Sequence, residues 1–160
     1  MEHNDAGSPG ELARRVFLRD DNLYGCAETS YIVLKSVFGL ERADDSSPAM
    51  ALNGGVAYSG SMCGALLGAG LALGELAAAR VDDQQVAKRE ARRQLQEIIA
   101  DFRSRFGATT CRELIKLDLS TPEGHDAFIE SGVWRKTCMA QIEFVVERLA
   151  ALAEDNADTI

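Results

Sequence analysis

Several features that indicate common biochemical functions are missing from this sequence. None of its four cysteines belongs to a Cys-x-x-Cys pair, so zinc ribbons, thioredoxin-type dithiols and covalently bound c-type haem all lack their local signature. The only histidines are His3 and His125, which argues against a histidine-rich metal site. No Ser–His–Asp set, phosphate-binding loop or paired-carboxylate site is recognisable. The residues that remain for chemistry are the cysteines.

The chain also has no excess of basic residues and no long hydrophobic run. Its formal net charge of −8 argues against binding to nucleic acid or to an anionic membrane surface. The most apolar stretch, Met62 to Gly74, is shorter than the ~20 residues that cross a bilayer. Residues 1–10 contain no apolar segment typical of a secretory signal. We therefore expect a cytoplasmic protein, a location in which structural disulfides are rare.

The composition is typical of one globular domain of ordinary size. The chain has 160 residues, of which 46% are hydrophobic and 26% charged. We expect a single domain over residues 10–154, a disordered tail over 1–9 and a frayed tail over 155–160. Apolar residues recur at helical spacing along this domain, and no segment shows the alternation of a strand. The sequence therefore predicts an all-α protein, a compact bundle of about five helices.

A glycine-rich stretch from Gly60 to Gly74 is predicted to begin the central helix of this bundle, which we expect to end near Arg80. The stretch contains no charged residue, no proline and no β-branched residue. Gly60, Gly64 and Gly68 recur every four residues and so share one helical face. Each glycine inside a helix costs about 1 kcal/mol relative to alanine. Close approach of another backbone or a bulky group at this face would explain their presence.

The four cysteines are distributed over four predicted helical segments. Cys26 is predicted to face inward from a helix over about residues 23–40, and Cys138 lies on the apolar face of the last helix, about residues 133–153. Cys63 and Cys111 fall in predicted first turns of helices, where free backbone N–H groups and the helix dipole favour the thiolate. The thiolate is the species that binds metals or attacks disulfides. The alternative is that each cysteine is a small buried hydrophobe without chemistry.

The order of these residues resembles the pattern of the C-GCAxxG-C-C family, whose members are described as redox-active. The residues that carry the resemblance are Cys26, the motif Cys63-Gly-Ala-Leu-Leu-Gly68, Cys111 and Cys138. The similarity extends from about Gly25 to Ala150, and Gly54-Gly55 resembles the glycine-rich approach to the motif. It implies a redox function for the four cysteines. Some relatives carry haem, but this chain has no Cys-x-x-Cys-His to attach it, so no covalent haem is expected.

Three functions agree with these observations. In the first, the four cysteines bind one iron–sulfur cluster, most simply [2Fe–2S], for electron transfer, and Gly64 and Gly68 leave room for this cofactor. In the second, the same cysteines are the catalytic residues of a thiol–disulfide oxidoreductase that cycles two pairs. In the third, the chain is a structural or binding protein whose cysteines bind zinc or no ligand at all. We favour the cluster, with all four cysteines as metal ligands. Whether the protein is an enzyme stays open, an oxidoreductase being the candidate.

Two expectations concern partners. Electron transfer implies a redox partner protein, which the sequence does not identify. A second stripe of small residues, Gly70 and Gly74 with alanines nearby, is smoother than one contact within the chain requires. It indicates a homodimer.

Overall fold

The structure, a computed structural model, describes residues 7–157 of the chain. Within these residues it contains seven α-helices, one 3₁₀ turn and one π-helical turn, and no strand. In chain order they are α1 (Pro9–Phe17), α2 (Cys26–Val37), η1 (Ser47–Ala49), α3 (Gly64–Arg80), α4 (Gln84–Phe106), α5 (Cys111–Ile115), α6 (Pro122–Ser131), η2 (Trp134–Cys138) and α7 (Met139–Ala157). The all-α prediction is confirmed. Short helices such as α1 and α5 bring the number above the expected five.

The predicted tails fall partly outside the described residues, which leave out 1–6 and 158–160. The helix α1 already begins at Pro9, where Ser8 provides the N-cap, and α7 continues to Ala157. The domain limits at 10 and 154 stay a prediction.

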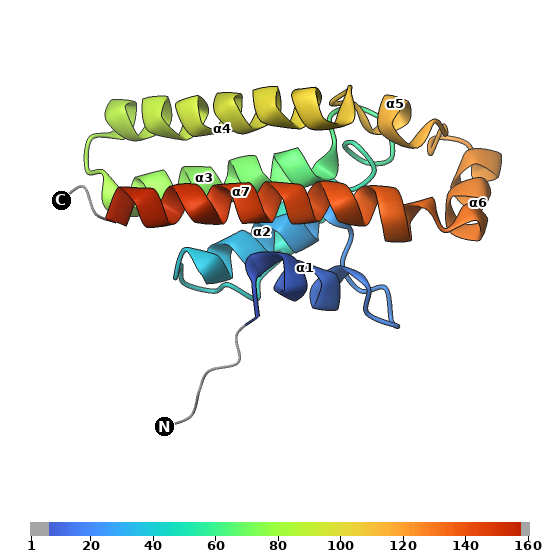
Figure 1. Cartoon of the computed structure of the whole chain (residues 1–160), viewed down its shortest axis with the longest axis horizontal. Coiled ribbons are helices and arrows are strands. Elements are labelled where there is room, and N and C mark those ends of the chain that lie inside the picture. The colour runs from blue at the N-terminus through green and yellow to red at the C-terminus, as the bar shows by residue number, and fades with distance from the viewer. Residues whose placement is uncertain (1–6, 158–160) are drawn as a thin grey trace.

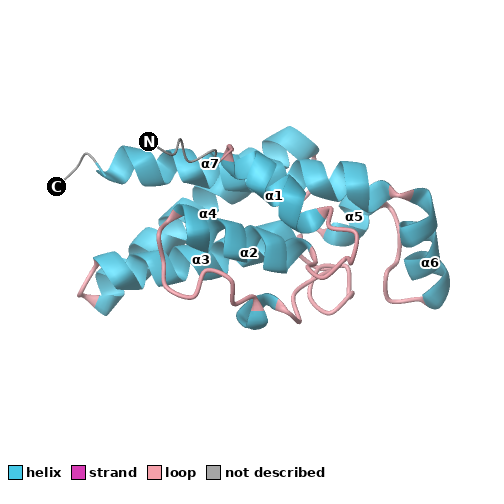
Figure 2. Cartoon of the chain, turned by 90° about the horizontal axis from the view of Figure 1, so that it is seen from below, coloured by secondary structure: helices cyan, strands magenta, loops and turns pink. Residues whose placement is uncertain are grey.

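Helix α3 is the centre of the bundle, as the glycine-rich sequence predicts. It packs against α2, α4 and α7, and Figure 1 shows α3, α4 and α7 extending along the length of the molecule. In Figure 2 the helices α5 and α6 lie at one end of this bundle, beyond the loops that precede α2 and α3. The first residues of α2, α3 and α5 therefore gather at the same end.

The central helix begins at Gly64, four residues later than expected. Gly60 has φ +76°, a left-handed conformation that an α-helix does not contain. Met62 instead forms an isolated antiparallel bridge with Thr110, far along the chain. This pairing, with the backbone hydrogen bonds on either side of it, holds residues 60–63 beside the start of α5. A contact distant in sequence, which local patterns do not reveal, thus sets where the helix begins.

The glycines of α3 allow α2 to approach closely. A methyl group on Gly64 would collide with the sulfur of Cys26, and one on Gly68 would collide with the carbonyl oxygen of Ala27 and the hydroxyl of Ser30. The space beside both glycines is occupied by α2, so they set the distance between the two helices. Their predicted role beside a cofactor stays a prediction.

The second small-residue stripe is divided between two environments. A methyl group on Gly70 would lie 3.2 Å from Leu95 of α4, whereas one on Gly74 would meet nothing within 4 Å. Part of the stripe therefore serves the contact between α3 and α4. The homodimer stays a prediction.

The core is built from the apolar stripes of the long helices. Ile98 and Phe102 of α4 are buried, as the sequence predicts, and so are Ile142 and Leu149 of α7. Burial of a side chain of this size stabilises a fold by roughly 1.5–3 kcal/mol. Among the residues that the structure describes, no helix is both long enough and apolar enough to cross a membrane.

Candidate functional site

The four cysteines lie near the beginnings of helices at one end of the bundle. Cys26 is the first residue of α2, Cys63 is the N-cap of α3 and Cys111 is the first residue of α5. Cys138 is the last residue of the π-helical turn η2, directly before α7. All four are free thiols; Cys26 is half-buried and the others are buried. Sequence analysis placed Cys63 and Cys111 near helix starts but put Cys26 inside a longer helix.

Cys26 and Cys63 are brought together by the contact between α2 and α3. The sulfur of Cys26 occupies the space that a side chain on Gly64 would need, and Gly64 directly follows Cys63. The backbone N–H groups of Gly54, Ala27 and Gly64 partly offset the rise that burial causes in the pKa of the Cys26 thiol. A glycine at position 64 is thus required for this sulfur to reach the first turn of α3.

Cys63 and Cys111 are joined through the short pairing before their helices. The N–H of Cys63 donates to the carbonyl of Thr109 at 2.8 Å, and the N–H of Cys111 donates to the carbonyl of Ser61 at 2.7 Å. A methyl group on Gly55 would lie 2.7 Å from the Cβ of Cys111. Backbone hydrogen bonds therefore fix these two cysteines, although the whole of α3 and α4 lies between them in the chain.

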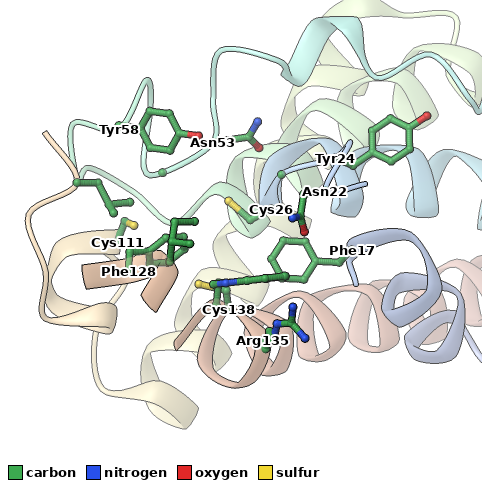
Figure 3. A pocket seen from close by; sticks show the side chains of 15 residues that line it. Phe17, Asn22, Tyr24, Cys26, Asn53, Tyr58, Cys111, Phe128, Arg135 and Cys138 are labelled. Carbon is green, nitrogen blue, oxygen red and sulfur yellow. The ribbon is translucent and has the colours of Figure 1, made fainter. Parts of the chain in front are cut away.

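Cys138 completes the group from the side of α7. It lines one pocket together with Cys26 and Cys111, and Figure 3 shows the three side chains directed toward the same space. Cys63 lies outside the wall of this pocket; its thiol donates to Oε1 of Gln141 at 3.7 Å. Gln141 is one helical turn after Cys138, so Cys63 also packs beside α7. Four segments of the chain thus bring four sulfurs into one region.

The electrostatic environment keeps the free thiols protonated. Burial raises the pKa of Cys26, Cys63 and Cys138, and it raises the pKa of Cys111 to about 11. Repulsion from the Cys26 thiolate contributes to the raised pKa of each of the other three. These mutual effects agree with the proximity of the sulfurs. At neutral pH a ligand-free site therefore holds neutral thiols, whose protons a metal would displace on binding.

The loop before the motif adopts a left-handed turn. Residues 54–58 have consecutive φ values between 50° and 69°. The turn is closed by hydrogen bonds from Ala57 N–H to the Ala51 carbonyl and from Ser61 N–H to the Gly55 carbonyl, both 2.8 Å long. A non-glycine residue in this conformation costs about 1–2 kcal/mol, and three of the five residues are not glycine. Such strain is found at functional sites, where the surroundings compensate for it.

A buried polar network connects this loop to the start of α2. The carboxylate of Glu28, only 7% exposed, accepts hydrogen bonds from Gly25 N–H at 3.2 Å, Asn53 Nδ2 at 2.8 Å and Ser46 Oγ at 2.9 Å. Oδ1 of Asn53 accepts from Ala27 N–H at 3.0 Å. Asn53 therefore caps α2 where Gly25 has no side chain to do so. This network holds Cys26 in place.

Sequence analysis missed this network and the pocket. The spacing of Gly25 and Glu28 is that of a capping box, which was a usable signal for the start of α2. The pocket wall combines aromatic side chains from segments far apart in sequence, so no local pattern predicted it. Its aromatic members are Phe17, Tyr24, Tyr58, Phe128 and Trp134.

The described residues contain no group of three or more His, Cys, Asp or Glu side chains arranged to hold a single metal ion. Four thiolates around one tetrahedral zinc lie about 3.8 Å from each other, since Zn–S bonds are about 2.3 Å long. The four cysteines surround one region without that tight geometry. The donor set is nevertheless the one used by [2Fe–2S] clusters, in which two irons divide four thiolates between them.

Comparison with known proteins gives one match. A family model described as "Putative redox-active protein (C_GCAxxG_C_C)" matches residues 24–152, which is most of the chain and includes all four cysteines. No curated protein matches the chain, and no solved structure does.

Proposed function

This chain belongs to the C_GCAxxG_C_C family, described as redox-active, and we propose that its four cysteines together bind one iron–sulfur cluster, most simply [2Fe–2S]. The observation that carries the proposal is the gathering of four thiols from four separate segments at one end of the bundle. Bound there, the cluster would accept and release single electrons. The protein would then act as an electron carrier or as the electron-transferring part of an oxidoreductase, with a partner protein as donor or acceptor.

The surroundings of the sulfurs support an anionic group. The N-termini of α2 and α3 both lie in this region, since Cys26 and Cys63 stand at the two helix starts. The positive ends of these helices stabilise negative charge. Backbone N–H groups near Cys26, among them that of Gly54, and those of Ala65 and Leu66 near Cys63 favour the thiolate form that ligates metal. Hydrogen bonds of this kind are also a means of tuning a cluster's potential.

The two other functions receive less support. A single zinc ion needs a tighter group of ligands than the described residues provide. A thiol–disulfide oxidoreductase needs a thiolate as nucleophile, and burial raises the pKa of all four thiols. The proximity of the Cys26 sulfur to the start of α3 nevertheless makes a Cys26–Cys63 disulfide the best form of that alternative.

The proposal is tested by purification without oxygen, followed by visible absorption and by iron, sulfide and zinc analysis. We expect two irons and two sulfides per chain, and an electron paramagnetic resonance signal after reduction by dithionite. Each Cys→Ser variant should lose most of the iron, because all four thiolates serve one group. Ser36→Ala, on the exposed part of α2, is the control that should keep it.

Other outcomes of the same experiment identify the alternatives. One zinc per chain, lost in each Cys→Ser variant, would support the binding protein. No metal, together with loss of two free thiols on oxidation, would support the oxidoreductase. In that case variants of one pair should leave the other pair able to cycle.

A further inference from the structure

We propose that the pocket beside the four cysteines binds a planar aromatic small molecule that carries a negatively charged group. This inference goes beyond the proposed function, because it rests on the aromatic and basic side chains of the pocket wall and not on the cysteines. The pocket has a volume of about 300 Å³ and is open to solvent on one side. Small-molecule sites have volumes upward of about 300 Å³, so this one suits a ligand of two or three fused rings.

The wall of the pocket is suited to a flat ring. Five aromatic side chains from five separate segments contribute to it (Figure 3). The rings of Phe17 and Trp134 meet edge to face, with centroids 5.7 Å apart at 83°, and Tyr58 is fixed in the same way against His125 at 5.5 Å. Aromatic rings held in this manner present rigid apolar faces and edges for a further ring.

The charge of the pocket favours an anion. Among the described residues that line it, Arg135 is the one charged side chain and none is acidic. The guanidinium lies 4.7 Å from the centroid of the Trp134 ring, and no carboxylate of a described residue forms an ion pair with it. Its five N–H donors are therefore available to a sulfonate, carboxylate or phosphate.

The position of the pocket makes it accessible and places its ligand near the cysteines. Tyr58 and Ile129, both on the wall, are 46% and 53% exposed, which is high for large apolar side chains. Cys63 does not reach the wall, so the pocket lies on the solvent side of the four-cysteine group. A ring bound here would lie between Cys26, Cys111 and Cys138 on one side and solvent on the other.

Trp134 is the only tryptophan of the chain and reports directly on this site. The full-length protein, purified without oxygen, would be titrated with anthraquinone-2-sulfonate while tryptophan fluorescence is recorded. We expect saturable quenching with one site per chain, confirmed by calorimetry. The neutral analogue 2-(hydroxymethyl)anthraquinone should bind about tenfold more weakly, because it has no partner for Arg135.

The arginine variants separate a specific site from apolar adsorption. Arg135→Gln should weaken binding of the sulfonate about tenfold and leave binding of the neutral analogue unchanged. Arg135→Lys, which keeps the charge, should retain most of the affinity, and circular dichroism checks that both variants are folded. Arg89→Gln, on an exposed part of α4, is the matched control that should change nothing.

Absence of saturable quenching, or equal affinity of wild type and folded Arg135→Gln for the sulfonate, would overturn the inference. The titration is run on iron-containing protein and on protein freed of metal by a chelator. Binding in both preparations supports a pocket independent of the cysteines' ligand. A protein that is purified without iron but still binds the sulfonate would contradict only the proposed function. A protein that contains iron but does not bind the sulfonate would contradict only this inference.

Discussion

The two ends of helix α3 differ in how closely other parts of the chain pack against them. At the C-terminal end, toward Arg80, the helix belongs to a regular bundle in which Gly74 faces open space. At the N-terminal end, Gly64 and Gly68 are covered by α2, and the chain before the helix turns through a left-handed loop held by a buried carboxylate. At Gly74 the regular end has room for an added methyl group. The cysteine end depends on contacts that tolerate no additional atoms.

The largest expected effect comes from Gly68→Ala. The added methyl group would collide with the Ala27 carbonyl and the Ser30 hydroxyl, and a backbone atom cannot move aside without displacing α2. Overpacking of this kind costs about 1–3 kcal/mol. Urea unfolding of the variant should show this loss of stability, together with reduced iron binding because Cys26 is on α2. An unchanged unfolding midpoint would show that α2 and α3 can separate at this contact without cost.

The polar network is the next most sensitive part. Asn53→Ala removes the cap of α2 and leaves the Glu28 carboxylate without one of its donors. A buried group deprived of its partner costs about 1–3 kcal/mol. We expect that loss in chemical denaturation and a weaker hold on iron. Ser36→Ala, an exposed change on the same helix, should have neither effect; equal behaviour of the two variants would contradict a role of the network in holding Cys26.

A third, smaller difference should appear with pH in metal-free protein. Burial and the Cys26 thiolate raise the pKa of Cys111 from 9.0 to about 11 in the folded state. Because the folded state binds this proton more tightly, its contribution to stability is full below pH 9 and is lost as pH rises through 11. The unfolding free energy should therefore fall between pH 8 and pH 11.

The variant Cys111→Ala isolates this contribution. Its unfolding free energy should fall less steeply over the same range, since the other thiols with raised pKa values still titrate. Parallel curves for the variant and the wild type would show that folding does not raise the pKa of Cys111.

The smallest effect is expected at the regular end, and it has the opposite sign. Gly74→Ala adds a methyl group where nothing lies within 4 Å, so the higher helix propensity of alanine acts alone. It should stabilise the protein by about 0.5–1 kcal/mol, measured by the same urea unfolding. Destabilisation would indicate that another surface, such as a second copy of the chain, covers Gly74.

The regular part of the fold could be predicted because its signals are local. The apolar stripe of α4, its N-cap at Asp83 and its left-handed end at Gly107 all follow from neighbouring residues. The cap of α5 is equally local, since the Thr110 hydroxyl accepts from the N–H of Glu113. These elements need no information from elsewhere in the chain.

The cysteine end could be predicted only in part, because distant contacts determine it. The identity of the four cysteines followed from the family pattern. The start of α3 is set by pairing of Met62 with Thr110, and the start of α2 by Asn53. The pocket wall combines residues from both ends of the chain, among them Phe17 and Trp134. No periodicity in the sequence contains such information.

Helices α3 and α4 form a hairpin that separates Cys63 from Cys111 in the sequence. The same hairpin brings Cys111 back beside Cys63 in space. The chain leaves the site along the 17 residues of α3 and comes back along the 23 residues of α4. One residue inserted within α4 would advance its end by about 1.5 Å and rotate it by about 100°. Thr109 and Thr110 could then no longer meet residues 61–63. The site thus constrains the exact number of residues in α4, although it contains none of the side chains of α4. Length variation is expected in the connections around α6 instead.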